Sequence, residues 1–174
     1  MPNDILTPYI KDFIKEYRDL IEDDNFADLY TEFDKLMYTR SGSPQHTPGY
    51  STFTNHLTEV LLEADVDPLI YLNYVPKSYL AWTNMKDFKI PAGIEVIDQN
   101  AFSNSNLESI TIPSTVKAIH KYAFANCSDL SDIYYDGTMK QWKAIKKESK
   151  WLTHQLTDKM LTIHCINGDF IARE

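Results

Sequence analysis

The side chains best suited to catalysis are scattered along this sequence rather than grouped. They are His46, His56, His120, His154 and His164, with Cys127 and Cys165. A nucleophile and its base must come within hydrogen-bonding reach of each other. His164 and Cys165 are adjacent in sequence on an expected strand, where neighbouring side chains point to opposite faces, so they do not form such a pair. A pair between Cys127 and a distant histidine stays open, and no pattern indicates one.

Motifs for cofactor and metal chemistry are also missing from the sequence. It contains no G-x-S-x-G, no P-loop, no H-E-x-x-H and no glycine-rich dinucleotide turn. The acidic residues Asp23, Asp24, Asp65 and Asp67 lack the spacing and the glycine of a calcium loop. We therefore expect no catalytic residue, no cofactor and no metal. A cryptic hydrolase or nucleotide-binding protein, built on the loop around His46 and His56, stays open as an alternative.

Charge divides the chain into two unlike halves. Residues 1–68 carry 14 acidic and 5 basic side chains, a net charge of −9, and residues 69–174 carry 11 and 12, a net charge of +1. Phosphates attract lysine and arginine, so we do not expect the acidic half to bind nucleic acid. That half could instead act as an acidic decoy, which mimics a nucleic-acid backbone. Four lysines are spaced to share one face of an expected helix: Lys140, Lys143, Lys147 and Lys150.

No segment indicates export or membrane insertion. The first residues include acids, with no basic region and no apolar run after it. No apolar stretch approaches the roughly 20 residues needed to cross a bilayer. We expect a cytoplasmic protein with free thiols and no membrane partner.

The first half has the apolar spacing of amphipathic helices. Apolar residues recur in steps of three and four over residues 5–22, again over 26–37, and again over 53–64. Serine, proline and glycine between the last two segments indicate a loop at 39–50. Asp67 followed by Pro68 is typical of the start of a short helical turn. These helices are expected to cap the structure that follows, or else to form an independent binding domain.

The second half repeats itself. Residues 74–91 align with residues 96–113 at an offset of 22, and a third copy begins at Ala118 with one inserted residue. Five apolar ladders stay in register across the three copies: Leu72/Ile94/Val116, Val75/Ile97/Ile119, Leu80/Phe102/Phe124, Met85/Leu107/Leu130 and Phe88/Ile110/Ile133. A period of this length with an L-x-x-L-x-L core is the signature of leucine-rich repeats, whose coils bury their apolar sides only by stacking.

Residues 91–135 are specific enough to indicate a family. They resemble the BspA-like leucine-rich repeats, whose units read roughly I-P-x-x-V-x-x-I-x-x-x-A-F-x-x-C-x-x-L. Residues 72–90 keep the register but have Tyr79-Leu80 where that pattern has Ala-Phe. The resemblance extends over residues 69–170 and implies a solenoid that binds other proteins. Members are often secreted surface adhesins, whereas short versions with a helical front look like proteins of gut-type bacteria and their phages.

The last segment is expected to close the solenoid. Thr138 with Gln141 forms a capping box, which predicts a helix that carries Trp142. Trp142, Trp151 and Leu152 are expected to cover the last coil. Leu161, Ile163 and Cys165 alternate as a strand, and Asn167-Gly168 indicates a hairpin turn. The predicted fold class is α+β: helices over 1–68, about three repeat coils over 69–136, and a helix-plus-hairpin cap over 137–174.

A binding face follows from the strand pattern. The x residues of L-x-x-L-x-L point outward and form rows across the coils: Lys86, Glu108 and Ser131; Asp87, Ser109 and Asp132; Lys89, Thr111 and Tyr134. A rigid sheet holds such rows in place before binding, which lowers the entropy lost on association. Tyr134 is the best single anchor, and Trp82, whose repeat mates are Asn104 and Asn126, is a second candidate.

We therefore predict a non-enzymatic, protein-binding module that acts through this strand face, the helical cap, or both. Its partner is expected to be another protein, and interference with a host or defence protein is one such role. The acidic decoy and the cryptic enzyme are the alternatives.

Overall fold

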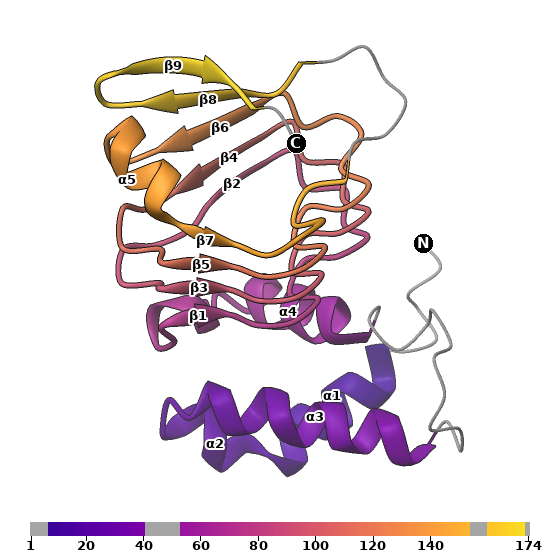
Figure 1. The fold of residues 1–174 in the computed structure, drawn as a ribbon. Coiled ribbons are helices and arrows are strands. Elements are labelled where there is room, and N and C mark those ends of the chain that lie inside the picture. Colours follow the sequence, from indigo (N-terminus) through magenta and orange to yellow (C-terminus); the bar gives the residue numbers. More distant parts are fainter. Residues whose placement is uncertain (1–6, 41–52, 154–159, 173–174) are drawn as a thin grey trace.

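The computed structural model describes residues 7–40, 53–153 and 160–172. Four helices come first: α1 (Thr7–Glu16), α2 (Arg18–Glu22), α3 (Phe26–Arg40) and α4 (Phe53–Glu63). A stack of parallel coils follows, and a helix and a hairpin close its far end (Figure 1). The predicted α+β order, with helices before parallel repeats, is confirmed. The predicted loop at 39–50 lies mostly outside the described residues, and its first two residues belong to α3.

The first predicted helix is interrupted. Instead of one helix over 5–22, the chain forms α1 and α2 with a break at Tyr17, whose φ of −104° and ψ of 28° leave the helical range. The apolar spacing survives the break, because Ile10 and Phe13 are buried and Leu20 packs against the same core. Spacing alone therefore predicted the buried face but could not predict the break.

A short helical turn leads from the helices to the coils. The Asp67 side chain accepts a hydrogen bond from the Leu69 backbone N–H at 3.0 Å and caps the 3₁₀ helix η2 (Pro68–Ile70), as predicted. The first coil then packs against the helices, where the rings of Tyr30 and Tyr79 are 6.2 Å apart and those of Phe26 and Tyr71 are 5.2 Å apart. The helices thus cover the first coil.

Each coil contributes one strand to each of two sheets, whose strands are parallel except for β9, which pairs antiparallel with β8. The smaller sheet orders β1 (Tyr74–Val75), β3 (Val96–Ile97), β5 (Ala118–Ile119) and β7 (Lys146–Lys147). The larger sheet orders β2 (Asp87–Lys89), β4 (Ser109–Ile112), β6 (Asp132–Tyr135), β8 (Thr162–Cys165) and β9 (Gly168–Ile171). Phe88, Ile110 and Ile133 lie side by side, as do Val75, Ile97 and Ile119, so the apolar ladders are in the predicted register.

An aromatic column runs through the core along the stacking direction. Neighbouring rings are 5.3–6.3 Å apart along the series Tyr30, Tyr79, Phe88, Phe102, Phe124, Trp151, Trp142 and Tyr135. Offset and edge-to-face pairs at such distances add stabilisation beyond the burial of apolar area. The column links the helices, the coils and the closing segment into one core.

The closing segment both covers the stack and extends it. The capping box of Thr138 and Gln141 starts α5 (Met139–Ala144), as predicted, and Trp142 is buried. However, β7 and β8 also add a fourth strand to each sheet, where the sequence predicted about three coils. The hairpin between β8 and β9 is confirmed, with Cys165 opposite Gly168, but its turn residues are Ile166 and Asn167 rather than Asn167 and Gly168.

The seam between the helices and the first coil holds buried polar atoms without partners among the described residues. The Tyr79 hydroxyl is one of them, and Asn55 and Ser78 contribute the others. Burial raises the pKa of the Tyr79 hydroxyl strongly. An unsatisfied buried hydroxyl costs about 1–3 kcal/mol, whereas a phenylalanine of the same shape loses nothing.

Tyr79→Phe is therefore expected to raise the free energy of unfolding by about 1 kcal/mol. Urea unfolding followed by circular dichroism measures the change. A loss of stability instead would mean that the Tyr79 hydroxyl has a hydrogen-bond partner in solution.

Candidate functional site

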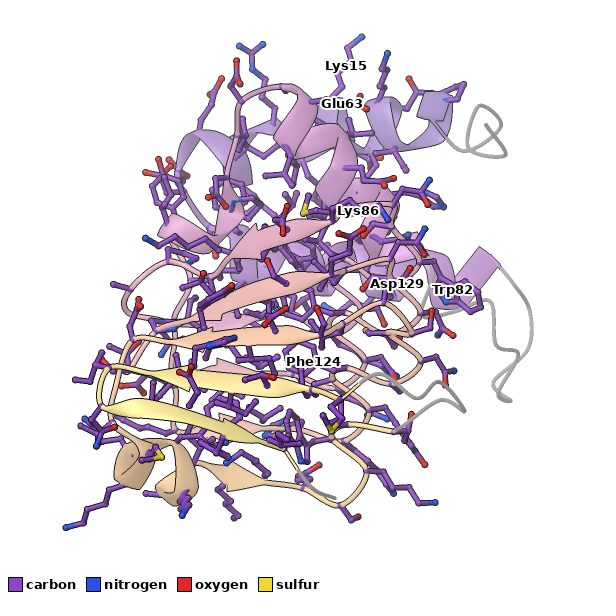
Figure 2. All side chains as sticks on the ribbon, turned by 90° about the horizontal axis from the view of Figure 1, so that it is seen from above. Lys15, Glu63, Trp82, Lys86, Phe124 and Asp129 are labelled. Carbon is purple, nitrogen blue, oxygen red and sulfur yellow. The ribbon has the colours of Figure 1, made fainter. Side chains whose placement is uncertain are left out.

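The outward side chains of the larger sheet form two rows that cross all five strands. The register gives one row of Asp87, Ser109, Asp132, Thr162 and Ile171, and a second row of Lys89, Thr111, Tyr134, His164 and Asp169. Figure 2 shows the strands of this sheet side by side. The sequence predicted the first three members of each row, and the closing hairpin adds the last two. That these residues bind a partner stays a prediction.

Hydrogen bonds and one ion pair join polar side chains on this face. Lys86 and Glu108 form an ion pair at 2.8 Å, and this contact raises the pKa of Lys86. The Ser109 hydroxyl donates to Asp87 at 2.6 Å. The Ser131 hydroxyl donates to Asp132 at 2.6 Å. These contacts fix side chains that would otherwise sample many rotamers, so less entropy remains to be lost on binding.

Tyr134 and His164 form a stacked pair at the centre of this face. Their ring centroids are 4.7 Å apart and the rings are nearly parallel, at 15°. Tyr134 is 46% exposed although β6 is paired on both sides. The pair therefore presents a flat aromatic surface whose position is set by two hydrogen-bonded strands.

Two carboxylates hold the His164 ring. Its Nε2 lies 2.7 Å from Asp132 Oδ1, and its Nδ1 lies 3.2 Å from Asp169 Oδ1. Both ring nitrogens can donate only when the ring is protonated. The hydrogen bond to Asp132, supported by Asp169, accordingly raises the pKa of His164. Hydrogen bonds from Ser131 and His164 lower the pKa of Asp132.

Sequence reasoning did not include His164 among the site residues. Alternation in the strand indicated that Thr162 and His164 point away from the core, but nothing in the sequence placed that strand beside β6. The placement of His164 could have been predicted only by assuming that the closing strand pairs with the last repeat strand. If the closing strand continues the sheet, His164 falls opposite Tyr134.

The sequence of the chain was compared with models of known protein families. A family model described as "BspA type Leucine rich repeat region (6 copies)" matches residues 72–154. Residues 72–154 are thus similar to BspA-type leucine-rich repeats. The match covers the repeat coils and α5, and it leaves out the N-terminal helices and the β8–β9 hairpin.

Comparison with solved structures finds a leucine-rich cell surface protein from Faecalibacterium prausnitzii A2-165. The identity is 38%, and the alignment covers 44% of this chain and 21% of that chain, with a TM-score of 0.40. The present chain thus aligns with about a fifth of that protein. No curated protein matches this chain.

The contacts of His164 with Asp132 and Asp169 lead to an expectation for pH-dependent stability. A pKa that is raised in the folded state stabilises the fold fully below the ordinary histidine value of 6.5, and this stabilisation is lost as the pH rises through the raised pKa. His164→Gln should therefore lower the free energy of unfolding by up to about 1 kcal/mol near pH 5.5, and by much less near pH 8.5. Urea unfolding at both pH values measures this. An equal loss at both would contradict a protonated His164.

Trp82 lies on a flank of the repeat region rather than on the strand face. It is 56% exposed, and Figure 2 shows it on the same side as Lys86 and Asp129. Its backbone is left-handed, with φ of 61°, as are its repeat mates Asn104 and Asn126. Asparagine tolerates this conformation better than tryptophan does. The tryptophan therefore does not suit the local backbone, and its exposure keeps it a candidate contact.

The lysine face predicted for residues 140–150 does not form. The helix ends at Ala144, and Lys146 and Lys147 belong to β7. Lys147 takes the rung of Ile119, where its ammonium donates to the Trp142 carbonyl at 2.6 Å and lies 4.6 Å from the Trp142 ring centroid. Burial lowers the pKa of Lys147 to about 8. The four lysines therefore do not share a helical face.

Among the described residues, Cys127, His56 and His120 make their hydrogen bonds with other residues and not with one another. Cys127 is buried and donates to the Phe102 carbonyl at 3.0 Å, and burial raises the pKa of its thiol. His120 contacts Asp98, and His56 contacts Glu59. His46 and His154 lie outside the described residues, so the alternative enzyme site at His46 stays a prediction. Within residues 7–40, 53–153 and 160–172, no group of histidine, cysteine and acidic side chains could hold a metal ion, and no helix could span a membrane.

Proposed function

We propose that this chain is a protein-binding module whose recognition surface is the outward face of β2, β4, β6, β8 and β9. Leucine-rich repeat domains are generally protein-binding modules. The observation that carries the proposal is the pair of five-residue rows, which lie in register on a hydrogen-bonded sheet. We propose no catalytic role for it.

Tyr134 is the proposed anchor of this surface. Exposed aromatic residues near the centre of an interface often account for much of the binding energy. Lys89, in the same row and two strands away, supplies a charge that would sit nearer the rim. Charges at a rim affect association rates and partner choice more than final affinity.

Affinity capture from a lysate of the source organism, followed by mass spectrometry, tests the proposal. Tyr134→Ala should reduce recovery of the main partner at least tenfold, as expected for an anchor worth about 2 kcal/mol, and Lys89→Glu should reduce it less. Lys146→Glu is the matched control, because Lys146 is exposed on the smaller sheet. Equal recovery by all three variants would exclude the strand face.

In the same experiment, Trp82→Ala tests whether the turn that carries Trp82, beside the strand face, contacts the partner. Loss of the partner in that variant alone would move the recognition surface from the strand face to the turn that precedes it. Loss in both Trp82→Ala and Tyr134→Ala would indicate one surface that wraps around the starts of the strands.

The acidic decoy is a second candidate, and the charge of the helices favours it. Seven acids on α1, α2, α3 and the turn between the last two are exposed: Asp12, Glu16, Asp19, Glu22, Asp23, Asp24 and Asp28. A decoy for a DNA-binding protein would compete with DNA, and added salt would weaken its binding strongly. Binding that ignores ionic strength would exclude it.

The cellular setting stays part of the proposal. We propose action in the cytoplasm on a protein of the host cell or its defences, because short versions of the family with a helical front resemble proteins of gut-type bacteria and their phages. Fractionation of source cells, with immunodetection of the chain, tests the location.

A further inference from the structure

The charges of the strand face are unevenly arranged. On β6, β8 and β9 the outward charged groups are the Asp132 and Asp169 carboxylates and the His164 imidazole. The lysines of the face lie at β2, two strands away from β6, and Lys86 is already paired with Glu108. The proton on His164 is therefore the only positive charge at this end of the described face.

His164 is surrounded by groups that respond to its charge. Asp132 and Tyr134 face it from β6 and Asp169 faces it from β9, while its own strand supplies the uncharged Thr162. With the proton, His164 and the two carboxylates carry a net charge of −1. Without it they carry −2, and one ring nitrogen can no longer donate to its carboxylate.

We propose that the outward face of β6, β8 and β9 binds a partner segment that carries lysine or arginine, and that loss of the His164 proton strengthens this binding. This inference rests on the proposed function, because it names the partner chemistry and the regulation of the same face.

Tyr134, Asp132 and Asp169 together favour the binding of a cationic side chain from the partner. An ammonium or guanidinium group binds the face of a tyrosine ring, and Tyr134 leaves nearly half of its surface exposed. Charge-assisted hydrogen bonds to Asp132 or Asp169 would hold the same group.

The proton and the partner compete for the same carboxylates. While His164 is charged, its two N–H groups occupy Asp132 Oδ1 and Asp169 Oδ1 and repel an approaching cation. A bound lysine or arginine would in turn disfavour the proton. Binding must therefore release a proton, and the affinity must rise with pH through the range in which His164 titrates.

The probe is a tetramethylrhodamine-labelled peptide of alternating arginine and threonine, blocked at its N-terminus. Fluorescence polarisation with the full chain should show roughly fivefold tighter binding near pH 8.5 than near pH 5.5, a change worth about 1 kcal/mol. His164→Gln should bind with similar affinity at both pH values. Equal affinity at both pH values for the unmodified chain would overturn the proposal, and so would an unchanged pH dependence in His164→Gln.

Matched carboxylate variants locate the bound peptide. Asp132→Asn and Asp169→Asn should each weaken binding near pH 8.5, while Asp12→Asn on the exposed face of α1 should leave it nearly unchanged. An equal loss in Asp12→Asn would place the peptide on the acidic helices and overturn the proposal. Far-ultraviolet circular dichroism confirms that each variant is folded.

A direct readout follows the His164 ring by proton NMR. Addition of the peptide should lower the pH at which the ring titrates, and an unmoved titration would contradict competition for the carboxylates. If the peptide fails these tests while Tyr134→Ala still loses the captured partner, the strand face remains the binding surface and only the charge control is excluded.

Discussion

Phe102→Ala should lower the free energy of unfolding by about 3–5 kcal/mol, the range for truncation of a buried phenylalanine. The Phe102 side chain is fully buried in the second coil. Its ring stacks on Phe124 with centroids 5.3 Å apart, and lies 5.6 Å from Phe88 in the coil before. The cavity would open between rigid coils that cannot close on it, so relaxation should recover little. Urea unfolding followed by circular dichroism measures the loss.

The sequence of the first coil suggests a control variant for Phe102→Ala. Leu80 occupies the position that corresponds to Phe102, so this rung accepts a leucine in one coil. Phe102→Leu should therefore cost much less than Phe102→Ala, although the ring contacts to Phe124 are lost in both. A loss below about 1 kcal/mol in Phe102→Ala would contradict a continuous core through the coils.

Trp142→Ala should have a comparable effect, again about 3–5 kcal/mol, because it uncovers the end of the stack. Trp142 is buried, its ring lies 5.3 Å from Tyr135 and 6.1 Å from Trp151, and Lys147 packs over it. In a repeat structure each coil contacts mainly its neighbours, so the damage should begin at the C-terminal end.

Hydrogen exchange separates this local effect from global unfolding. In Trp142→Ala, amides of β6, β7 and β8 should exchange faster than in the unmodified chain, while amides of α3 and β1 change least. Trp151→Ala is the control, since Trp151 is only partly buried and its loss should cost less. Uniform acceleration along the chain would show that the coils do not unfold from the end.

The parts of the fold that could be predicted are those fixed by repetition. Ladders such as Phe88, Ile110 and Ile133 recur at nearly constant spacing, and stacking leaves them only one register. The helices were predicted from apolar spacing, which reports the buried face well. It does not report where the backbone leaves the helical range, so the break at Tyr17 was missed.

The C-terminal segment was harder to predict because it lacks the repeat. Four lysines at helical spacing indicated a helical face, but helix α5 stops at Ala144 and Lys147 takes an interior rung. Its long apolar stem fills the rung of Ile119 while its ammonium reaches the last carbonyls of the helix. The spacing of charged residues predicts an exposed face only when the secondary structure of the segment is already known.

The absence of the repeat from the C-terminal segment also explains why His164 and Asp169 were not predicted as site residues. Tyr134 was identified because its coil could be aligned with two others. His164 and Asp169 belong to strands outside the aligned copies, and only the pairing of β8 with β6 brings them to Tyr134. Their role depends on a contact between segments about 30 residues apart, which the sequence does not encode as a pattern.

Hydrogen–deuterium exchange of the full chain, with and without its captured partner, tests most directly whether the strand face is the recognition surface. The proposed function predicts slower exchange in the partner-bound chain over residues 86–90, 108–112, 131–135 and 162–171, with little change in α1–α4. Slower exchange confined to residues 7–40 and 53–63, with these strands unaffected, would contradict it and favour the acidic helices as the binding surface.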